Sequence, residues 1–395
     1  MIIGVPEERY EETRVALIPP VAEGLVEDGF DVLVAAGAGD DAGWSDDEYQ
    51  AVGCEIVDDD DVFERSDVLF QVRALGAAAE SETDRYQEGQ IVIGLLGPYD
   101  VDDELETLAG QDVTSFALEL MPRISRAQSM DALSAMDSIS GYKATMMAAE
   151  TLPKILPMEM TAAGTIQPAD VFVVGAGVAG LKAIATAERL GASTKAYDIR
   201  PEVKEEVESL GGEFVELDLE TDDDASDDQG QATEQDEEFI RKQREMMTRV
   251  VGEADVVITT ANIPGRPAPE LVTTEMIEEM APGSVVVDLA AKRGGNCEPT
   301  QPDERITHEG VEIIGPTNVP ATVASTSSRL YANNVVNFFE NLLDDGEVVV
   351  DTDDEIIDDT MLTRDGVVRD PHLDDEAEEE EEEEGVEQER TEVDE

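Results

Sequence analysis

Short apolar runs and amphipathic stretches alternate along most of the chain. Near the N-terminus, MIIGVP (1–6) and FDVLVAAGAG (30–39) are typical of buried strands, and PPVAEGLVEDG (19–29) between them has the spacing of a helix. Further apolar runs follow, up to QIVIGLLG (90–97). Strands that alternate with helices form a parallel sheet covered by helices, so this region is predicted to be doubly wound α/β.

A second series of the same kind starts at ADVFVVGAGVAG (169–180) and ends at VEIIGPTNVP (311–320). Between the two series, residues 128–160 are predicted to be linking helices. The predicted fold class is therefore α/β, with two Rossmann-like, doubly wound parallel-sheet domains that flank a cleft and are linked by long helices.

The segment after Pro320 makes the first domain discontinuous. Its apolar residues recur at helical spacing, at Leu330, Val335, Val336, Phe338, Phe339, Leu342 and Leu343. This amphipathic helix is predicted to return to the first sheet, so the N-terminal domain comprises 1–127 and 321–345, and the second domain comprises 161–320. From 346 to 395 the chain becomes acidic and poor in apolar residues, which predicts a largely disordered tail.

Composition adds an extreme negative charge. The chain has 95 Asp and Glu against 26 Lys and Arg, a formal net charge of −69. Residues 374–395 hold only 15 of those acids, so most of the charge lies on the folded region. Such a surface repels nucleic acid and anionic lipid, which excludes both as partners. It is typical of a halophilic protein, because concentrated salt screens the self-repulsion.

The expected cellular location follows from the absence of a signal peptide, of a membrane-spanning run and of paired cysteines in the sequence. The first residues show neither the basic start nor the apolar run of a signal peptide, and no window reaches about 18 apolar residues. Cys54 and Cys297 have no nearby partner, which favours a reducing compartment and argues against a metal such as zinc. We expect a cytoplasmic protein without direct membrane insertion.

A glycine motif opens the second series. Gly175, Gly177 and Gly180 follow the apolar run VFVV and precede the helical LKAIATAERLG. The first glycine allows a tight turn, the second lets the backbone approach a pyrophosphate, and the third lets helix pack on strand. Asp198 ends the next strand, where a carboxylate binds ribose hydroxyls and repels a 2′-phosphate. The motif predicts NAD rather than NADP, although Arg200 could soften that preference.

The stretch RISRAQSMDALS (123–134) concentrates polar groups in a cation-poor chain. If a helix begins near Ser129, one face carries Gln128, Asp131, Ser134 and Ser138. Beside Arg123 and Arg126, this face could hydrogen-bond a carboxamide and a ribose. The same residues also fit a plain helix start, in which Asp131 favours the N-terminal dipole and one Arg pairs with a surface acid. Spacing alone leaves both interpretations open.

Acid–base groups are scarce where a dehydrogenase would need them. A dehydrogenase that acts on an alcohol or amino acid moves a proton with each hydride. The only histidines, His308 and His372, are more typical of surface positions, and no Lys precedes Lys143. Hydride transfer between two nicotinamide rings needs positioning but no proton at the reacting carbon, so the composition favours that reaction.

LELMPRISRAQSMD (118–131) resembles the NAD(H)-binding component, or alpha subunit, of the proton-translocating nicotinamide nucleotide transhydrogenases. The similarity runs from Gly4 to about Leu343 and includes ITTANIPGRPAP and GGNC. Alanine dehydrogenases share the fold of this family.

The resemblance implies a site assembled from both domains. Arg123, Gln128, Asp131 and Ser134 would hold the nicotinamide and its ribose, with Gln128 orienting the ring for direct transfer. The rest of NAD(H) is assigned to Gly175, Ala176, Gly177, Val178, Gly180, Asp198, Ile199, Arg200, Ala261 and Asn262. The resemblance also implies a homodimer that docks on an NADP(H)-binding subunit and a membrane proton-channel subunit, at the inner face of the cell membrane.

The chain departs from this family in the polar segment that starts at Leu219, a solvated linker or the mobile loop that closes over NAD. Family members carry a Tyr in that loop, whereas none occurs here between Tyr197 and Tyr331, and Phe239 is the candidate to replace it in loop closure.

Positions aligned with the Lys and His of alanine dehydrogenases are Gln71-Val72-Arg73 and Leu95-Leu96-Gly97, which argues against an amino acid substrate. An alanine-type dehydrogenase and a non-enzymatic NAD-binding protein remain the alternatives.

Overall fold

The structure is a computed structural model that describes residues 1–9, 12–77, 82–216, 241 and 243–369. The chain divides into two compact units, unit 1 with Met1–Met136 and Pro320–Glu395, and unit 2 with Asp137–Val319. The polar segment from Leu219, its Phe239 and the chain beyond Arg369 lie outside the described residues.

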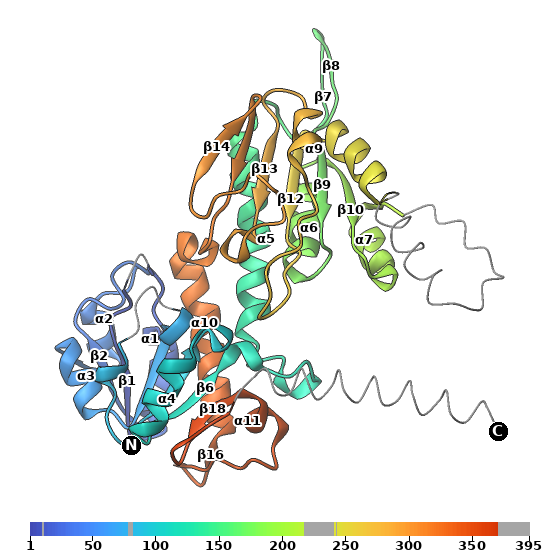
Figure 1. The fold of residues 1–395 in the computed structure, drawn as a ribbon. Helices are drawn as coiled ribbons and strands as arrows, with labels where there is room; N and C mark the ends of the chain where they lie inside the picture. The colour runs from blue at the N-terminus through green and yellow to red at the C-terminus, as the bar shows by residue number, and fades with distance from the viewer. Residues whose placement is uncertain (10–11, 78–81, 217–240, 242, 370–395) are drawn as a thin grey trace, which may run out of the picture. The chain divides into compact units, whose positions relative to one another are not determined.

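Unit 1 contains an eight-stranded sheet of order β19-β18-β6-β5-β4-β1-β2-β3 (Figure 1). The six parallel strands are β1 (Ile2–Val5), β2 (Asp31–Ala35), β3 (Glu55–Val57), β4 (Val68–Arg73), β5 (Ile91–Leu95) and β6 (Thr114–Ala117). The helices between them are α1 (Pro19–Glu27), α2 (Asp46–Ala51), α3 (Asp59–Arg65) and α4 (Asp102–Gly110). The apolar runs of the sequence form the strands, and β1, β2, β4 and β5 are largely buried, as strands covered by helices are.

Helix α10 (Ala324–Asn341) returns to this sheet with aromatic side chains. Phe339 packs edge-on against Phe30 and Phe70, each with ring centroids 5.4 Å apart, and Phe338 packs against Phe116. The buried Tyr331 hydroxyl donates to the Gln71 carbonyl oxygen at 2.7 Å. These contacts fix α10 on unit 1.

Residues 346–369 correct the prediction of a disordered tail that starts at 346. After the hairpin β16 (Leu343–Asp344) and β17 (Glu347–Val348) come α11 (Glu355–Thr360), β18 (Met361–Arg364) and β19 (Val367–Val368). Strand β18 pairs antiparallel with β6 and so extends the sheet. Ile356, Ile357 and Leu362 are at most 2% exposed. The prediction was wrong here because a few apolar side chains that bury completely outweigh an acidic average composition.

Trp44, the only tryptophan of the sequence, lies in the turn region that precedes α2. Its backbone N–H donates to Gly39, and its ring lies 5.7 Å from the Arg329 guanidinium of α10. It is half-buried within unit 1.

Unit 2 contains a seven-stranded sheet of order β11-β10-β9-β12-β13-β15-β14, parallel except for β14. The strands are β9 (Asp170–Val174), β10 (Ser193–Tyr197), β11 (Glu213–Phe214), β12 (Val256–Thr259), β13 (Val285–Asp288), β14 (Arg305–His308) and β15 (Val311–Ile314). The helices with described bounds are α6 (Val178–Arg189), α7 (Lys204–Ser209) and α9 (Thr274–Glu278).

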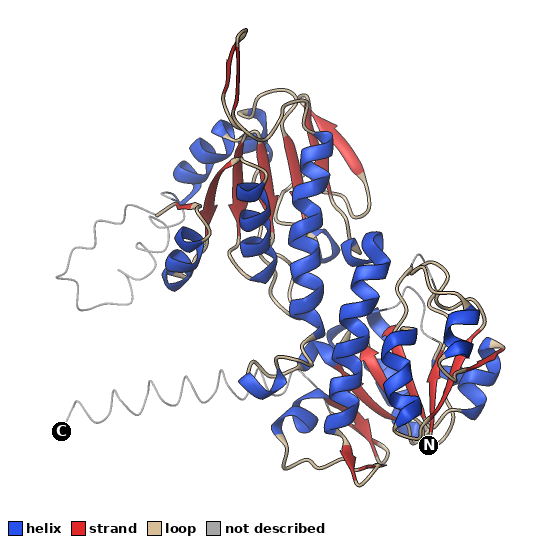
Figure 2. Cartoon of the chain, turned by 180° about the vertical axis from the view of Figure 1, so that it is seen from behind, coloured by secondary structure: helices blue, strands red, loops and turns tan. Residues whose placement is uncertain are grey.

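Helices cover both faces of this second sheet (Figure 2). Val171 and Val173 of β9 join the core with α6, whereas the alternate residues Phe172 and Val174 join a second core with α9 and the helical residues 243–253. Side chains on a strand alternate between faces, so an uninterrupted apolar strand serves two cores. The predicted α/β class with two sheets is confirmed.

Helix α5 (Ala132–Thr151) leads from unit 1 into unit 2, and the exposed hairpin β7 (Glu159–Thr161) and β8 (Gly164–Ile166) follows it. The expected helical stretch 128–160 is therefore shorter, with a helix that begins at Ala132 rather than near Ser129. Short 3₁₀ helices complete the fold, at Leu75–Ala77, Thr83–Arg85, Pro98–Asp100, Leu118–Leu120 (η4), Ser125–Ala127 (η5), Pro201–Val203, Ala291–Arg293 and Val319–Val323. Among the described residues, no helix is both long and apolar enough to cross a membrane.

Candidate functional site

The glycine turn joins β9 to α6 in unit 2. Gly175 has φ +95°, a left-handed conformation that favours glycine, and Gly177 is the N-cap of α6. A Cβ on Gly180 would lie 1.9 Å from the carbonyl oxygen of Gly175, so only glycine permits this approach of helix to strand. A Cβ on Gly177 would meet nothing within 4 Å. The second glycine thus leaves open space in front of the free N–H groups that begin the helix, an arrangement suited to an anion such as a pyrophosphate.

Asp198 lies directly beside this turn. One carboxylate oxygen accepts the Ala176 N–H at 2.7 Å, and the Arg200 side chain donates to both oxygens at 3.0 Å. Burial by itself would raise the pKa of Asp198, but the hydrogen bonds from Arg200 and Ala176 outweigh it and lower the pKa. Asp198 is therefore a carboxylate at neutral pH, as ribose recognition requires.

Three exposed apolar side chains follow adjacent strands at the same edge of the sheet. Val178, Ile199 and Ile263 come just after β9, β10 and β12, and Ile199 is 72% exposed. Exposed apolar groups around a phosphate turn are suited to the flat faces of nucleotide rings. Ala261 and Asn262 lie in the loop after β12, beside the turn.

Two residues that the sequence analysis did not select support this loop. The buried Asn296 accepts the Ala261 N–H at 2.9 Å and donates to the carbonyl oxygens of Ala261 and Pro269, both at 2.8 Å. The Thr260 hydroxyl donates to the Gly175 carbonyl oxygen at 3.0 Å and so ties the loop to the glycine turn. The GGNC motif signalled Asn296, but only as a resemblance.

Asp288 at the end of β13 has a structural role. Fully buried, it accepts hydrogen bonds from the hydroxyls of Thr259 and Thr300 and from the backbone N–H groups of Ala290 and Cys297, at 2.8–3.0 Å. These four donors satisfy its carboxylate and hold the ends of neighbouring segments together.

The other candidate residues, from Arg123 to Ser134, lie in unit 1. Asp131 precedes α5 and accepts both the backbone N–H of Ser134, at 2.8 Å, and the Ser134 hydroxyl. It therefore caps the helix, which explains why α5 starts at Ala132. Only Ser134 and Ser138 of the four residues expected on one helical face lie within α5, since Gln128 follows η5.

Arg123 and Arg126 differ in their surroundings. The Arg126 guanidinium donates twice to the Asp354 carboxylate, at 2.7 and 2.5 Å. Among the described residues, no acid forms an ion pair with Arg123, and both Arg123 and Gln128 are exposed to solvent. The interpretation as a plain helix start thus fits Arg126, which pairs with an acid, and Asp131, which caps the helix. The side chains of Arg123 and Gln128 are exposed and accessible to a ligand.

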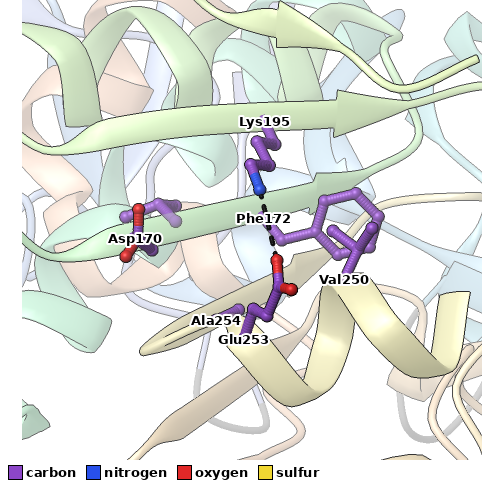
Figure 3. A pocket seen from close by; sticks show the side chains of 7 residues that line it. Asp170, Phe172, Lys195, Val250, Glu253 and Ala254 are labelled. Carbon is purple, nitrogen blue, oxygen red and sulfur yellow. Dashed lines mark ion pairs between the residues drawn. The ribbon is translucent and has the colours of Figure 1, made fainter.

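A small pocket at the opposite end of the second sheet does not belong to this site. Asp170 and Lys195 of β9 and β10, with Glu253, contribute to its lining, and Lys195 pairs with Glu253 at 3.5 Å (Figure 3). Asp170 is the first residue of β9, whereas the glycine turn follows the last residue of that strand, so the pocket and the candidate nucleotide site are at different ends of β9.

The candidate residues include no histidine and no recognisable metal-binding cluster. His308 pairs with Glu278 at 3.2 Å on the outer strand β14, and His372 lies outside the described residues. No group of three or more His, Cys, Asp or Glu that could hold a metal ion occurs in the described portion of the chain.

Comparison with known proteins identifies the family. Residues 4–140 match the model of the alanine dehydrogenase/PNT N-terminal domain, and residues 144–371 match that of the C-terminal domain. The chain belongs to the alanine dehydrogenase/PNT family. The chain has one domain of each type, and the C-terminal match extends over the segment 346–369.

Relatives of two kinds match this chain. The chain is 44% identical over 379 residues to the first portion of the NAD(P) transhydrogenase alpha subunit of Rhodospirillum rubrum, a match that covers 94% of this chain and 99% of that protein. A transhydrogenase structure from Sinorhizobium meliloti matches with 42% identity and a TM-score of 0.83, over 93% of this chain and 100% of that one. An L-alanine dehydrogenase structure matches with 26% identity and a TM-score of 0.78, over 94% and 98%. The predicted resemblance to the transhydrogenase alpha subunit is confirmed.

Proposed function

We propose that this chain is the NAD(H)-binding subunit of a proton-translocating NAD(P) transhydrogenase. It is an oxidoreductase component that exchanges a hydride between NAD(H), held here, and NADP(H), held by a partner subunit. The observation that carries the proposal is the glycine turn with Asp198 beside it, in a chain 44% identical to a subunit named for this reaction. A membrane subunit would couple the transfer to proton movement, with this chain as a peripheral homodimer at the cytoplasmic face.

The second unit supports binding of the dinucleotide. The open space at Gly177 and the N–H groups that begin α6 fit a pyrophosphate, and the ionised Asp198 fits the adenosine ribose. A 2′-phosphate would be repelled by this carboxylate, although Arg200 partly neutralises it. The residues present therefore favour NAD(H) over NADP(H).

The first unit supports positioning of the reacting ring. When bound, NADH supplies a hydride from its nicotinamide. Arg123 and Gln128 have exposed donors that can orient a carboxamide, and the Asp131–Ser134 pair can accept from a ribose hydroxyl. None of these groups needs to take up a proton, which agrees with transfer from ring to ring.

An alanine-type dehydrogenase is the second candidate, because the fold matches an L-alanine dehydrogenase with a TM-score of 0.78. Its chemistry needs an acid–base group. The Gln71 side chain instead accepts the Tyr86 hydroxyl at 2.6 Å, the Arg73 side chain donates to Ala77, and Leu96 is buried and apolar. These surroundings favour the transhydrogenase.

The test is cyclic hydride transfer between NADH and an NAD analogue in concentrated salt, with and without the NADP(H)-binding subunit. We expect transfer only with that subunit, and Gln128→Asn to lower kcat about tenfold or more because the ring is displaced. Gln50→Asn, the same change at an exposed position of unit 1, is the control. Reduction of NAD by alanine with the chain alone would support the dehydrogenase instead, and NADH binding without any transfer would support a non-enzymatic protein.

A further inference from the structure

The C-terminal segment, residues 346–369, contacts the stretch that leads to Gln128 at several points. In the first, β18 pairs with β6, with Met361 opposite Phe116. The buried Thr363 hydroxyl lies 2.7 Å from the Ser115 hydroxyl and donates to the Val113 carbonyl oxygen at 2.8 Å. The strand that enters the stretch is therefore held by the segment.

The next two contacts lie further along the stretch. Helix α11 packs on η4 (Leu118–Leu120). Asp354 then caps α11 by accepting the Ile356 N–H at 3.0 Å, while its two oxygens receive the Arg126 guanidinium. Asp354 is mostly buried, with 21% of its side chain exposed. The helix start thus fixes the carboxylate, and the carboxylate fixes Arg126.

Arg126 lies two residues before Gln128, and a second set of contacts lies directly after it. The Ser129 carbonyl oxygen accepts from the side chains of Asn334 and Asn337 of α10, at 2.9 and 3.0 Å. Asn341 of the same helix accepts from Arg126 at 3.2 Å. Gln128 is therefore exposed between two anchored neighbours.

We propose that Asp354, acting through Arg126, is a positioning residue for hydride transfer, and that the C-terminal segment sets the placement of Gln128. The inference rests on the proposed function. According to this inference, residues 346–369 help to position Gln128 although none of them is a candidate ligand-binding residue.

The pair is suited to orientation more than to stability. Arg126 is half exposed, and exposed ion pairs contribute little to folding. A guanidinium that donates twice to one carboxylate has a defined direction, however, so it restricts the backbone that carries it. A change that keeps the fold but loosens this pair should therefore lower the rate of transfer while affecting NADH binding little.

The test uses Asp354→Asn in the full chain, assembled with the NADP(H)-binding subunit. Asparagine keeps the cap on α11 but loses the charge. We expect kcat of cyclic transfer to fall about five- to tenfold, with KM for NADH changed by less than about twofold. Asp358→Asn is the matched control, because the Asp358 carboxylate lies in the same segment but pairs with Arg369 instead of Arg126. That variant should retain the wild-type kcat.

A double-mutant cycle that combines Asp354→Asn with Arg126→Gln tests whether the two residues act together or affect the transfer rate independently. If the pair acts as one unit, the double variant transfers hydride no more slowly than the worse single variant. Losses that multiply, or an Asp354→Asn variant with wild-type kcat, would overturn the inference while wild-type transfer still supports the proposed function. A wild-type chain that binds no NADH would instead overturn the proposed function, and this inference with it.

Discussion

Gly177 and Gly180 lie in one turn but have opposite surroundings. A Cβ on Gly180 would collide with the Gly175 carbonyl oxygen, whereas a Cβ on Gly177 would enter open space. The same substitution at these two positions therefore separates stability from ligand binding.

We expect Gly180→Ala to lower the free energy of unfolding by about 3 kcal/mol or more, because α6 must move away from the strand. Gly177→Ala should cost about 1 kcal/mol or less, yet weaken NADH binding at least about tenfold by obstructing the pyrophosphate. Chemical denaturation and NADH titration by fluorescence measure the two effects. Equal loss of affinity and stability in both variants would show that position 177 does not face the ligand.

Burial raises the pKa of both cysteine thiols. It raises the pKa of Cys297 to about 12, assisted by Asp288, and the pKa of Cys54 to about 11. Each folded-state pKa is above the unfolded value, so the folded chain keeps its thiol protons when the unfolded chain loses them. This contribution to stability is complete below about pH 8.5 and is lost as pH rises towards 11 and 12.

At pH 9 we expect iodoacetamide to alkylate neither thiol of the native chain, and to alkylate both after unfolding, at least about 100-fold faster. Mass spectrometry of the modified peptides measures this. Cys54→Ser and Cys297→Ser variants assign any residual reaction, and rapid modification of the native chain would contradict the burial.

At the scale of elements, the apolar pattern was sufficient for the sheets but not for their edges. The runs at β1, β9 and β12 are almost entirely buried, so the apolar pattern identified them. The start of α5 was placed about three residues too early, because a polar face at Gln128 and a helix cap at Asp131 give the same spacing. Only the contact of Asp131 with Ser134 distinguishes them.

The residues of the candidate site could be predicted where they form a local sequence motif with a known physical basis. They could not be predicted where contacts between distant parts of the chain determine the geometry. The glycine turn and Asp198 follow from spacing along one βαβ unit. The support from Asn296 and the pairing of Arg126 with Asp354 join residues 35 and 228 positions apart, which no local pattern reveals.

The C-terminal segment provides a test at this scale. We expect a chain that ends at residue 345 to lose more than about 4 kcal/mol of unfolding free energy, because Ile356, Ile357 and Leu362 each contribute about 1.5–3 kcal/mol. It should also aggregate, since the edge of β6 is then uncovered. A chain that ends at Arg369 is the control and should match the full chain in denaturant. Equal stability of both truncated chains would show that the segment adds nothing to unit 1.

For the whole molecule, the net charge of −69 dominates the response to solvent. We propose that the fold needs concentrated salt, because unscreened carboxylates repel one another more strongly in the compact state. The midpoint temperature of thermal unfolding should rise steadily between 0.2 and 3 M KCl, by about 5 °C or more over the whole range. Circular dichroism measures it, with sucrose of equal osmolality as the uncharged control. A midpoint that ignores KCl, or that sucrose raises equally, would contradict the proposal.

The position of Trp44 has a spectroscopic consequence. As the only tryptophan of the sequence, it confines the intrinsic indole emission to unit 1, while both units contribute to the peptide signal in the far ultraviolet. If the two units unfold independently, the fluorescence transition and the ellipticity transition separate. One residue next to α2 therefore makes the cooperativity between the units measurable without any added label.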